Sequence, residues 1–468
     1  RMTPAGQNPS LVTAYRRFQQ DEAVAFITRQ AEVLRRHTTK PVTLNSSLNH
    51  YIDHPSTFQT LDFASFDHYS HSTEPHRMRL FMDIFKTLKP RSPWWVMETA
   101  PSYSGCWLGH MPLHESGYLA AEAAQAWAMG AQTFSLWLWR QQRSGSEMAH
   151  GSVLQSWGTP SPGFEEVKRA TTLLKKLTPV LDESGPVHAN IALMWSDRAR
   201  AFFRTEPLEE GCATYADTIG HWHRLLFEAG FPVDGVFPED PLLDYSVLLT
   251  PCLPDVPESV IQSGRRLMER GGTWICGPLS GIRTAEHTIP TSHALGAFGV
   301  AFDVPAMTVV PLTGSGTQGA ALDMTAELGW FAALAQEQAS ECWSLLGRTT
   351  TGPVSGMAFL LERRIGPGRL ILLGAMPQGE PGDAMLTALI RSIAETPVLK
   401  NLPKGITAIP RVRGNGEETL WILVNVTSEP VRWIPEKAMR NLFDGHRTEA
   451  GSAIIFRPFD VRAMGIIT

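Results

Sequence analysis

The first 180 residues alternate between short hydrophobic runs and longer segments in which hydrophobic positions have helical spacing. The clearest runs, residues 94–98 and 133–140, are continuous and free of internal Gly or Pro, as is typical of strands buried on both faces of a parallel sheet. Shorter runs occupy 42–45 and 63–69, and helical spacing covers 9–36, 77–88, 116–129 and 164–177. This order predicts four βα units, which is half of an eight-stranded TIM barrel.

The first helical segment, residues 9–36, has charged residues between its apolar positions. We expect its apolar face to point inward and Ser10 to cap its N-terminus. The apolar positions are Leu11, Tyr15, Phe18, Phe26, Ile27 and Leu34.

The pattern changes near Pro186, where hydrophobic runs begin to alternate with amphipathic helical segments. The runs lie at 190–195, 232–236, 247–249 and 273–276, and the helices at 215–229, 258–270 and 385–395. Such alternation predicts an open α/β domain of the flavodoxin or glutaminase type. From about Pro397, short strands separated by Gly and Asn turns predict a small antiparallel β-sandwich. We therefore expect three domains, at 1–185, 186–396 and 397–468.

Composition excludes several classes of protein. A net charge of -5 gives no indication of nucleic-acid binding, and no apolar run reaches membrane-spanning length. An odd number of cysteines without CxxC spacing argues against a disulfide framework or a four-thiolate zinc site and fits a reducing, cytoplasmic location. No nucleotide-binding motif is present, and we expect no cofactor and no metal. The five cysteines are Cys106, Cys212, Cys252, Cys276 and Cys342.

Polar and aromatic side chains follow the predicted barrel strands at their carboxyl ends, where parallel βα folds place their sites. They are Asn45, Asp67, Tyr69, Glu98, Trp107, Arg140, Glu147 and His150. Such a rim suits a sugar, whose hydroxyls need polar partners and whose ring face needs an aromatic one. In retaining glycoside hydrolysis, one carboxylate attacks the anomeric carbon and a second, about 5 Å away, protonates the leaving oxygen. We expect Glu98 to be the nucleophile, kept ionised by donors such as Arg140; the alternative is a structural Glu98–Arg140 ion pair.

These motifs resemble the β-galactosidases of glycoside hydrolase family 42. Residues 97–102, Trp107, 139–141 and 147–150 are similar to the family's seventh and eighth barrel strands, and 8–9, 41–45 and 67–69 to its fifth and sixth units. The resemblance extends through the α/β segment to the C-terminus. Two departures are Thr99, where the family usually has Gln, and a loop to Trp107 that is one residue longer.

The resemblance implies that the barrel part is the C-terminal half, with strands five to eight, and it assigns roles to individual residues. Glu98 matches the nucleophile, and four residues match positions that bind the galactose of a galactoside or oligosaccharide: Tyr69, Trp107, Glu147 and His150. We expect Asp67 and Arg140, which also follow predicted strands, to bind the substrate as well. The α/β segment resembles a trimerisation domain, which implies a homotrimer.

The family's acid/base Glu lies in an Asn-Glu pair at the end of strand four, and no such pair occurs in the first 150 residues. We therefore expect a fragment of a longer protein that hydrolyses galactosides poorly alone. Three alternatives remain open. The chain is a noncatalytic sugar-binding or assembly subunit, a glycosidase acting on β-linked fucose or α-L-arabinopyranose, or an amidotransferase. The last ranks lowest because no nucleophile elbow with a following His/Glu pair is recognisable.

Overall fold

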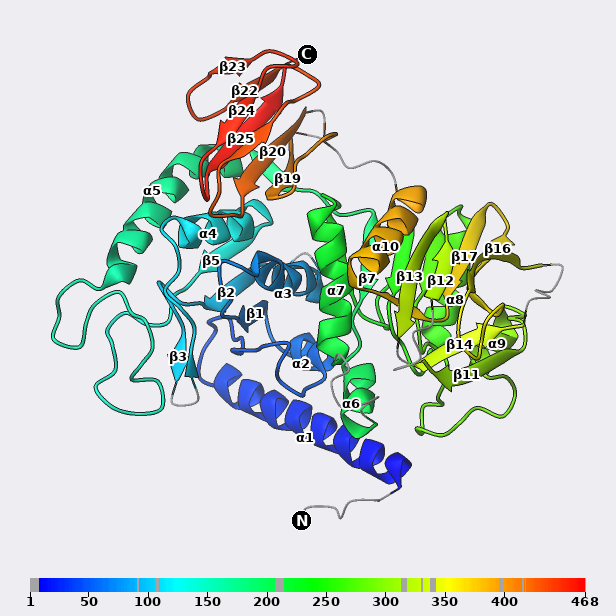
Figure 1. The fold of residues 1–468 in the computed structure, drawn as a ribbon. Helices are drawn as coiled ribbons and strands as arrows, with labels where there is room; N and C mark the ends of the chain where they lie inside the picture. The colour runs from blue at the N-terminus through cyan, green and yellow to red at the C-terminus, as the bar shows by residue number, and fades with distance from the viewer. Residues whose placement is uncertain are drawn as a thin grey trace.

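The computed structural model describes residues 8–467 except 91, 107–108, 207–213, 313–317, 330, 337–341, 395–398, 415 and 417. A three-stranded parallel sheet of order β1-β2-β5 lies at the centre of the N-terminal region (Figure 1). Its strands are β1 (Ala64–Asp67), β2 (Trp94–Glu98) and β5 (Ala131–Phe134). Around it lie α1 (Pro9–Arg35), α2 (His54–Gln59), α3 (Pro75–Leu88), α4 (Tyr118–Ala128), α5 (Pro162–Asp182), and the short strand pair β3 (Gly105–Cys106) and β4 (Gly109–His110).

Parallel pairing aligns the carboxyl ends of these strands. The register places Asp67 of β1 opposite Glu98 of β2, so two acidic residues end neighbouring strands. Below them, Phe66 and Val96 are fully buried, and α3 and α4 cover the sheet with buried apolar faces. The apolar interior thus fixes the strands, while the polar residues collect at their ends.

Two predicted barrel strands differ from the structure. Residues 42–45 run beside β1 without forming a strand, because side chains occupy their backbone groups: the Asp62 carboxylate accepts from Val42 N, and the Ser65 hydroxyl donates to Leu44 O. The predicted strand 133–140 is also wrong in its bounds, since β5 begins earlier and ends at Phe134. The described residues of the N-terminal region therefore form a parallel sheet of three strands rather than the four predicted.

The orientation predicted for the first helix is wrong. Asn8 rather than Ser10 caps α1, the helix contacts α6 and α2, and its fully buried residues are small or polar: Thr13, Gln20 and Ala31. Val12, Val24 and Ile27 are partly buried, whereas the other large apolar side chains point to solvent, with Phe18 56% and Phe26 61% exposed. The exposed apolar residues of α1 are Leu11, Tyr15, Phe18, Phe26, Val33 and Leu34.

A twelve-stranded mixed sheet follows, as expected for an α/β region. Its parallel part has the order β8-β7-β9-β10-β17, and the four predicted runs correspond to β7, β8, β9 and β10. The antiparallel part, β11 to β16 with β18, lies between the last predicted run and the last predicted helix. The strands are β7 (Ile191–Met194), β8 (Val233–Val236), β9 (Val247–Thr250), β10 (Thr273–Cys276), β11 (Met307–Pro311), β12 (Gln318–Ala321), β13 (Met324–Gly329), β14 (Phe331–Ala335), β15 (Ser344–Thr349), β16 (Ala358–Ile365), β17 (Gly368–Leu373) and β18 (Met376–Gln378). The helices are α6 (Asp197–Thr205), α7 (Tyr215–Glu228), α8 (Glu258–Glu269), α9 (Gly296–Ala301) and α10 (Gly379–Ile393).

The C-terminal region is an antiparallel six-stranded sheet of order β23-β22-β25-β20-β19-β6, with a separate β21-β24 pair. One of its strands, β6 (Ser184–Pro186), comes from before the α/β region and spans the predicted boundary at residues 185 and 186. Arg411 of β19 anchors the sheet on the barrel half by donating to the carbonyl oxygens of Ala128 and Leu181. The other strands are β19 (Ile406–Arg413), β20 (Glu418–Asn425), β21 (Val431–Trp433), β22 (Met439–Asn441), β23 (Arg447–Thr448), β24 (Ile454–Phe456) and β25 (Val461–Ile466).

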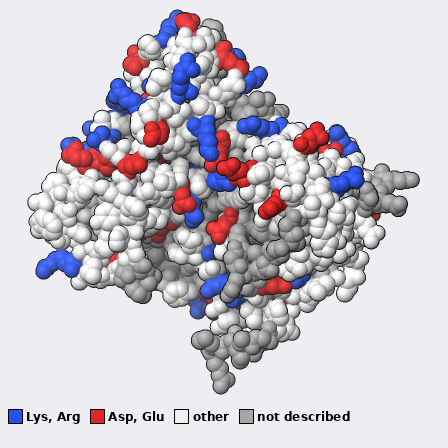
Figure 2. Space-filling model, in the orientation of Figure 1, with Lys and Arg blue, Asp and Glu red and all other residues white. Residues whose placement is uncertain are grey.

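The surface carries charges of both signs. Figure 2 shows Lys and Arg interspersed with Asp and Glu on the visible face. No helix in the described part of the chain has the length and apolarity needed to cross a membrane. Cys106, Cys252, Cys276 and Cys342 are free thiols, while Cys212 lies outside the described residues.

Candidate active site

Glu98 is half-buried at the carboxyl end of β2, and each of its carboxylate oxygens accepts a hydrogen bond. Asn45 Nδ2 donates to Oε1 at 2.7 Å, and the Tyr69 hydroxyl donates to Oε2 at 2.7 Å. Hydrogen bonds of this kind favour the ionised form of a carboxyl group. The donors on Glu98 are therefore neutral side chains rather than the expected Arg140.

Tyr69 is the residue around which the site gathers. Its ring packs edge-on against His150, with the ring centroids 5.2 Å apart. Burial, the hydrogen bond to Glu98 and the charges of Glu98, Asp67 and Glu147 raise the pKa of Tyr69 well above its usual value. The phenol thus remains a proton donor, and three acidic residues lie within electrostatic reach of its oxygen.

Asp67, at the end of the neighbouring strand, has a raised pKa. Burial, followed by the negative charge of Glu98, raises the pKa of Asp67 to about 7. Its Oδ1 is buried and has no hydrogen-bond partner among the residues that the structure describes. A carboxyl group with a pKa near neutrality can hold or release a proton in the pH range where most enzymes work.

His150 and Glu147 lie in the long segment between β5 and α5. His150 is buried, and its Nδ1 hydrogen bonds to the Gly151 carbonyl oxygen at 2.8 Å. The carbonyl requires a proton on Nδ1, so in the neutral ring Nε2 is an acceptor, and within the described chain it has no partner. Glu147 Oε2 accepts from Trp137 Nε1 at 3.1 Å and from Gln142 Nε2 at 3.4 Å.

The structure thus gathers Asp67, Tyr69, Glu98, Glu147 and His150, as the strand-end argument predicts. Two other expected residues differ. Arg140 is exposed and donates through Nε to the Ser156 carbonyl oxygen at 3.1 Å, so the predicted pairing with Glu98 is wrong. Trp107 lies outside the described residues.

Sequence reasoning missed the roles of Asn45 and Trp137. Asn45 was expected only on the polar rim, and its contact with Glu98 depends on how residues 42–46 run beside β1. Trp137 falls in a hydrophobic run that looked like a buried strand, yet β5 ends three residues earlier and frees the indole to bind Glu147. No pattern in the sequence signals either contact.

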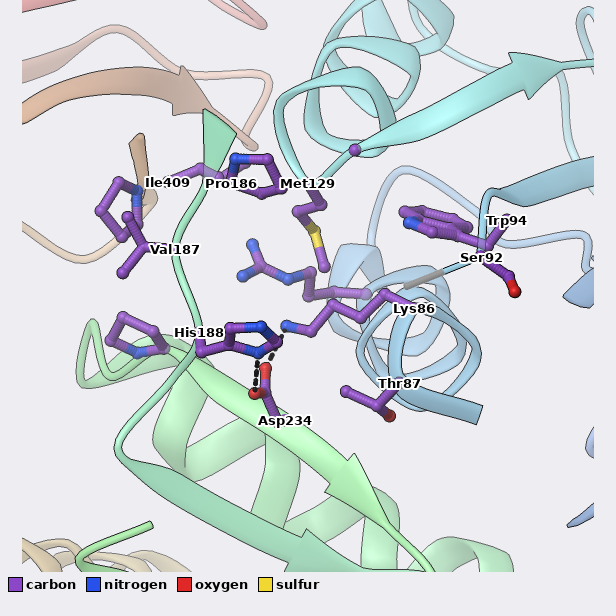
Figure 3. A pocket seen from close by; sticks show the side chains of 14 residues that line it. Lys86, Thr87, Ser92, Trp94, Met129, Pro186, Val187, His188, Asp234 and Ile409 are labelled. Carbon is purple, nitrogen blue, oxygen red and sulfur yellow. Dashed lines mark ion pairs between the residues drawn. The ribbon is translucent and has the colours of Figure 1, made fainter. Parts of the chain in front are cut away.

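A cavity of about 250 Å³ lies away from this site, where α3, β8 and β19 meet (Figure 3). Its charged groups pair with one another: Lys86 Nζ lies 2.9 Å from Asp234 Oδ1, and His188 Nδ1 lies 3.5 Å from Asp234 Oδ2. None of the expected site residues lines it. Nor do the described residues include a group of three or more His, Cys, Asp or Glu arranged to hold a metal ion.

Comparisons with known proteins place this geometry in a family. Residues 1–177 match the family model described as "Beta-galactosidase", and residues 189–400 match the model described as "Beta-galactosidase trimerisation domain". The chain is 36% identical over 465 residues to beta-galactosidase YesZ of Bacillus subtilis (strain 168), covering 98% of this chain and 69% of that protein. It is 35% identical over 427 residues to YesZ of Bacillus licheniformis, covering 91% of this chain and 63% of that protein.

Solved structures share the fold. A catalytic mutant of Gan42B, a GH42 beta-galactosidase from G. stearothermophilus, superposes with a TM-score of 0.86 at 19% identity, covering 99% of this chain and 70% of that one. The beta-galactosidase of Halorubrum lacusprofundi gives a TM-score of 0.83 at 22% identity, covering 99% and 69%. The chain thus spans about two thirds of the length of its relatives. Both family models and the identity to the Bacillus proteins show that the chain belongs to the glycoside hydrolase family 42 β-galactosidases.

Proposed function

We propose that this protein acts as a retaining β-galactosidase on terminal β-D-galactosyl residues, with Glu98 as the nucleophile. The pair of hydrogen bonds from Asn45 and Tyr69 carries the proposal. Neutral donors favour the ionised carboxylate without placing a cation against it, so the oxygens retain the negative charge that a nucleophile needs. The Bacillus relatives that are named beta-galactosidase YesZ support the proposed activity.

The reaction has two displacements. A Glu98 oxygen bonds to the anomeric carbon while the bond to the leaving oxygen breaks, and that oxygen takes a proton from an acid/base carboxyl group. Water then attacks the anomeric carbon and gives a proton to the same carboxylate, and the bond to Glu98 breaks. Two inversions at one carbon retain its configuration.

We propose that Asp67, Tyr69, Glu147 and His150 hold the sugar. Asp67 Oδ1 and His150 Nε2 are the two buried site atoms that have no partner within the described chain, so a sugar hydroxyl can bind to each. A protonated Asp67 donates, and His150 Nε2 accepts. Trp107 remains an expected substrate contact by resemblance, and Arg140 by its place after a predicted strand.

We propose that the acid/base carboxyl comes from further βα units of the barrel. The apolar face of α1 supports this, because six large hydrophobic side chains on one helix would lose contact with water if such units packed on it. The relatives are longer by about a third of their own length, which provides room for those units.

The assembly is a separate proposal. The match of residues 189–400 to a trimerisation-domain model supports a homotrimer formed through the α/β region. Sedimentation equilibrium measures the mass of the particle, and a monomer at micromolar concentration would contradict this proposal without affecting the catalytic one.

The nucleophile can be tested without an acid catalyst. In 2,4-dinitrophenyl 2-deoxy-2-fluoro-β-D-galactopyranoside the leaving group departs unprotonated, and the fluorine slows hydrolysis of the glycosyl-enzyme. We expect one label per chain, found by peptide mass spectrometry on Glu98, and no label in Glu98→Gln. The exposed Glu115→Gln is the matched control, which should react like the wild type.

Other outcomes would identify an alternative. A label on another residue would overturn the nucleophile assignment. No label, together with galactose binding by calorimetry, would favour a noncatalytic sugar-binding subunit. Faster reaction with the corresponding β-fucoside or α-L-arabinopyranoside would keep the mechanism and change the substrate.

A further inference from the structure

A second acidic residue lies behind the nucleophile. Glu122 of α4 is only 2% exposed, and the hydroxyl of Thr99, the residue that follows Glu98, hydrogen bonds to its Oε2 at 3.3 Å. The Tyr118 hydroxyl donates to Glu122 Oε1 at 2.7 Å. Both carboxyl oxygens therefore have partners, and one partner adjoins the nucleophile in sequence.

The surroundings of Glu122 disfavour the charged form of its carboxyl group. The two residues on each side of it in sequence are alanines, and in the described part of the chain no cation offsets the cost of burying its charge. Burial raises the pKa of Glu122 to about 7. A buried carboxyl without a counter-charge costs free energy, and a mid-helix Ala would avoid that cost, so Glu122 requires another explanation.

Thr99 connects this carboxyl group to the site from two directions. Its own backbone continues directly from Glu98, and its carbonyl oxygen accepts from Trp137 N at 2.9 Å. Trp137 in turn donates its indole N–H to Glu147. A displacement of Thr99 would therefore shift the expected nucleophile and the expected sugar-binding Glu147 together.

We propose that Glu122 is a positioning residue for the glycosidase site, which holds the carboxyl end of β2 and the residue 137 backbone in place through the side chain of Thr99. The inference rests on the proposed function, because it assigns Glu122 a task in the reaction of Glu98. Glu122 does not touch the substrate. A chain with a wrongly placed nucleophile should still bind sugar but react slowly, since reaction rate is more sensitive to the geometry of attack than binding is.

Matched substitutions separate positioning from packing. Thr99→Val keeps the shape and removes the hydroxyl, whereas Thr99→Ser keeps the hydroxyl. Glu122→Leu removes the polar atoms, whereas Glu122→Gln preserves hydrogen bonding without a charge. Thr57→Val is the control for losing a buried hydroxyl elsewhere, since Thr57 is fully buried in α2 and donates to Asp53 O.

The first measurement is the rate of labelling by the fluorinated galactoside over a range of concentrations. We expect Thr99→Val and Glu122→Leu to lower the saturating rate constant by about tenfold and to change the half-saturating concentration less than about twofold. Glu122→Gln, Thr99→Ser and Thr57→Val should react at nearly the wild-type rate. A wild-type rate in Thr99→Val would overturn the inference, even if Glu122→Leu fails to fold.

The second measurement does not depend on catalysis. Hydrogen exchange at the Trp137 amide, which donates to Thr99 O, reports the position of this segment. We expect faster exchange in Thr99→Val and in any folded Glu122→Leu, but not in Glu122→Gln or Thr57→Val. If the wild type fails to label, the proposed function fails, and hydrogen exchange alone decides whether Glu122 positions the strand. Unchanged exchange at the Trp137 amide in Thr99→Val would then refute the positioning role of Glu122.

Discussion

The Tyr69 hydroxyl donates to Glu98 Oε2 at 2.7 Å and joins the end of β1 to the end of β2. A hydrogen bond to a charged acceptor contributes about 1.5–3 kcal/mol. In Tyr69→Phe, Glu98 loses one of its two donors and the hydrogen bond that holds its Oε2 in place. We expect the rate of labelling at neutral pH to fall about 10- to 100-fold.

The matched control for Tyr69→Phe is Tyr245→Phe. Tyr245 also donates to a carboxylate, Asp234 Oδ2 at 3.2 Å, but it lies at the junction near β8 rather than at the site. This control should leave the rate of labelling unchanged. If Tyr69→Phe reacts at the wild-type rate, the hydrogen bond to Glu98 has no part in the chemistry.

Asp67 should set the alkaline limb of the reaction. Its pKa is raised to about 7 by burial and by the charge of Glu98, so below that pH it can donate to a sugar hydroxyl. Above about pH 7 it ionises, loses the donor and places a second negative charge beside Glu98. For labelling by the fluorinated galactoside, we expect the saturating rate constant divided by the half-saturating concentration to fall above that pH in the wild type. In Asp67→Asn this limb should move to higher pH, and an unmoved limb would assign it to another group.

Glu122 should make the stability of the fold depend on pH. Its pKa rises from an ordinary 4.5 to about 7 in the folded protein, so between these pH values the folded state retains a proton that the unfolded state releases. Stability contributed by that proton is complete below pH 4.5 and is lost as pH rises to 7. Glu122→Gln does not titrate. Its free energy of unfolding relative to the wild type should therefore increase across this window by on the order of 3 kcal/mol.

Urea unfolding of both proteins at several pH values measures this difference. Asp67 titrates in the same direction, but it is present in both chains and cancels in the comparison. A constant difference from pH 4 to pH 8 would mean that Glu122 is ionised in the folded state.

The sequence predicts those parts of the fold that depend on local patterns. Continuous hydrophobic runs identify β2, β7 and β10, because a strand buried on both faces has no polar position to interrupt it. Glu98 and Asp67 could be recognised because acidic residues ending such strands must lie at one edge of the sheet. The same reasoning failed for β11 to β15, whose burial is mixed and whose pairing is set by strands distant in the chain.

Contacts between distant segments could not be predicted. Periodicity identifies an apolar face on α1, but it cannot say whether that face meets this chain, since the pattern is the same for a core and for an interface. The Asn45 contact with Glu98 depends on an irregular segment held by side chains. Glu122 has no signal at all, because a single acidic residue in an alanine-rich helix usually faces solvent.

The exposed face of α1 should cause the chain to associate. Phe18 and Phe26 are more than half exposed, so Phe18→Ser with Phe26→Ser removes apolar contact area at little cost to the fold. We expect sedimentation velocity to show less concentration-dependent association in this variant than in the wild type. Replacing the exposed Ile455 on β24 with Ser is the control for losing an isolated apolar side chain, and equal effects would show that α1 has no special part in association.

The ion pairs at the cavity of Figure 3 should stabilise the contact between the barrel half and the α/β region. Lys86 of α3 is largely buried and lies between Asp83 and Asp234, the latter on β8. Removing one partner leaves a buried carboxylate without its counter-charge, which costs about 3–5 kcal/mol, so Lys86→Met should unfold at lower urea concentration.

Arg35→Met is the matched control for Lys86→Met. It breaks an ion pair to Asp62 in which both side chains are about 40% exposed, and pairs of that kind contribute less than about 1 kcal/mol. Equal losses of unfolding free energy in the two variants would mean that the buried ion pair at the junction contributes no more to stability than the exposed one.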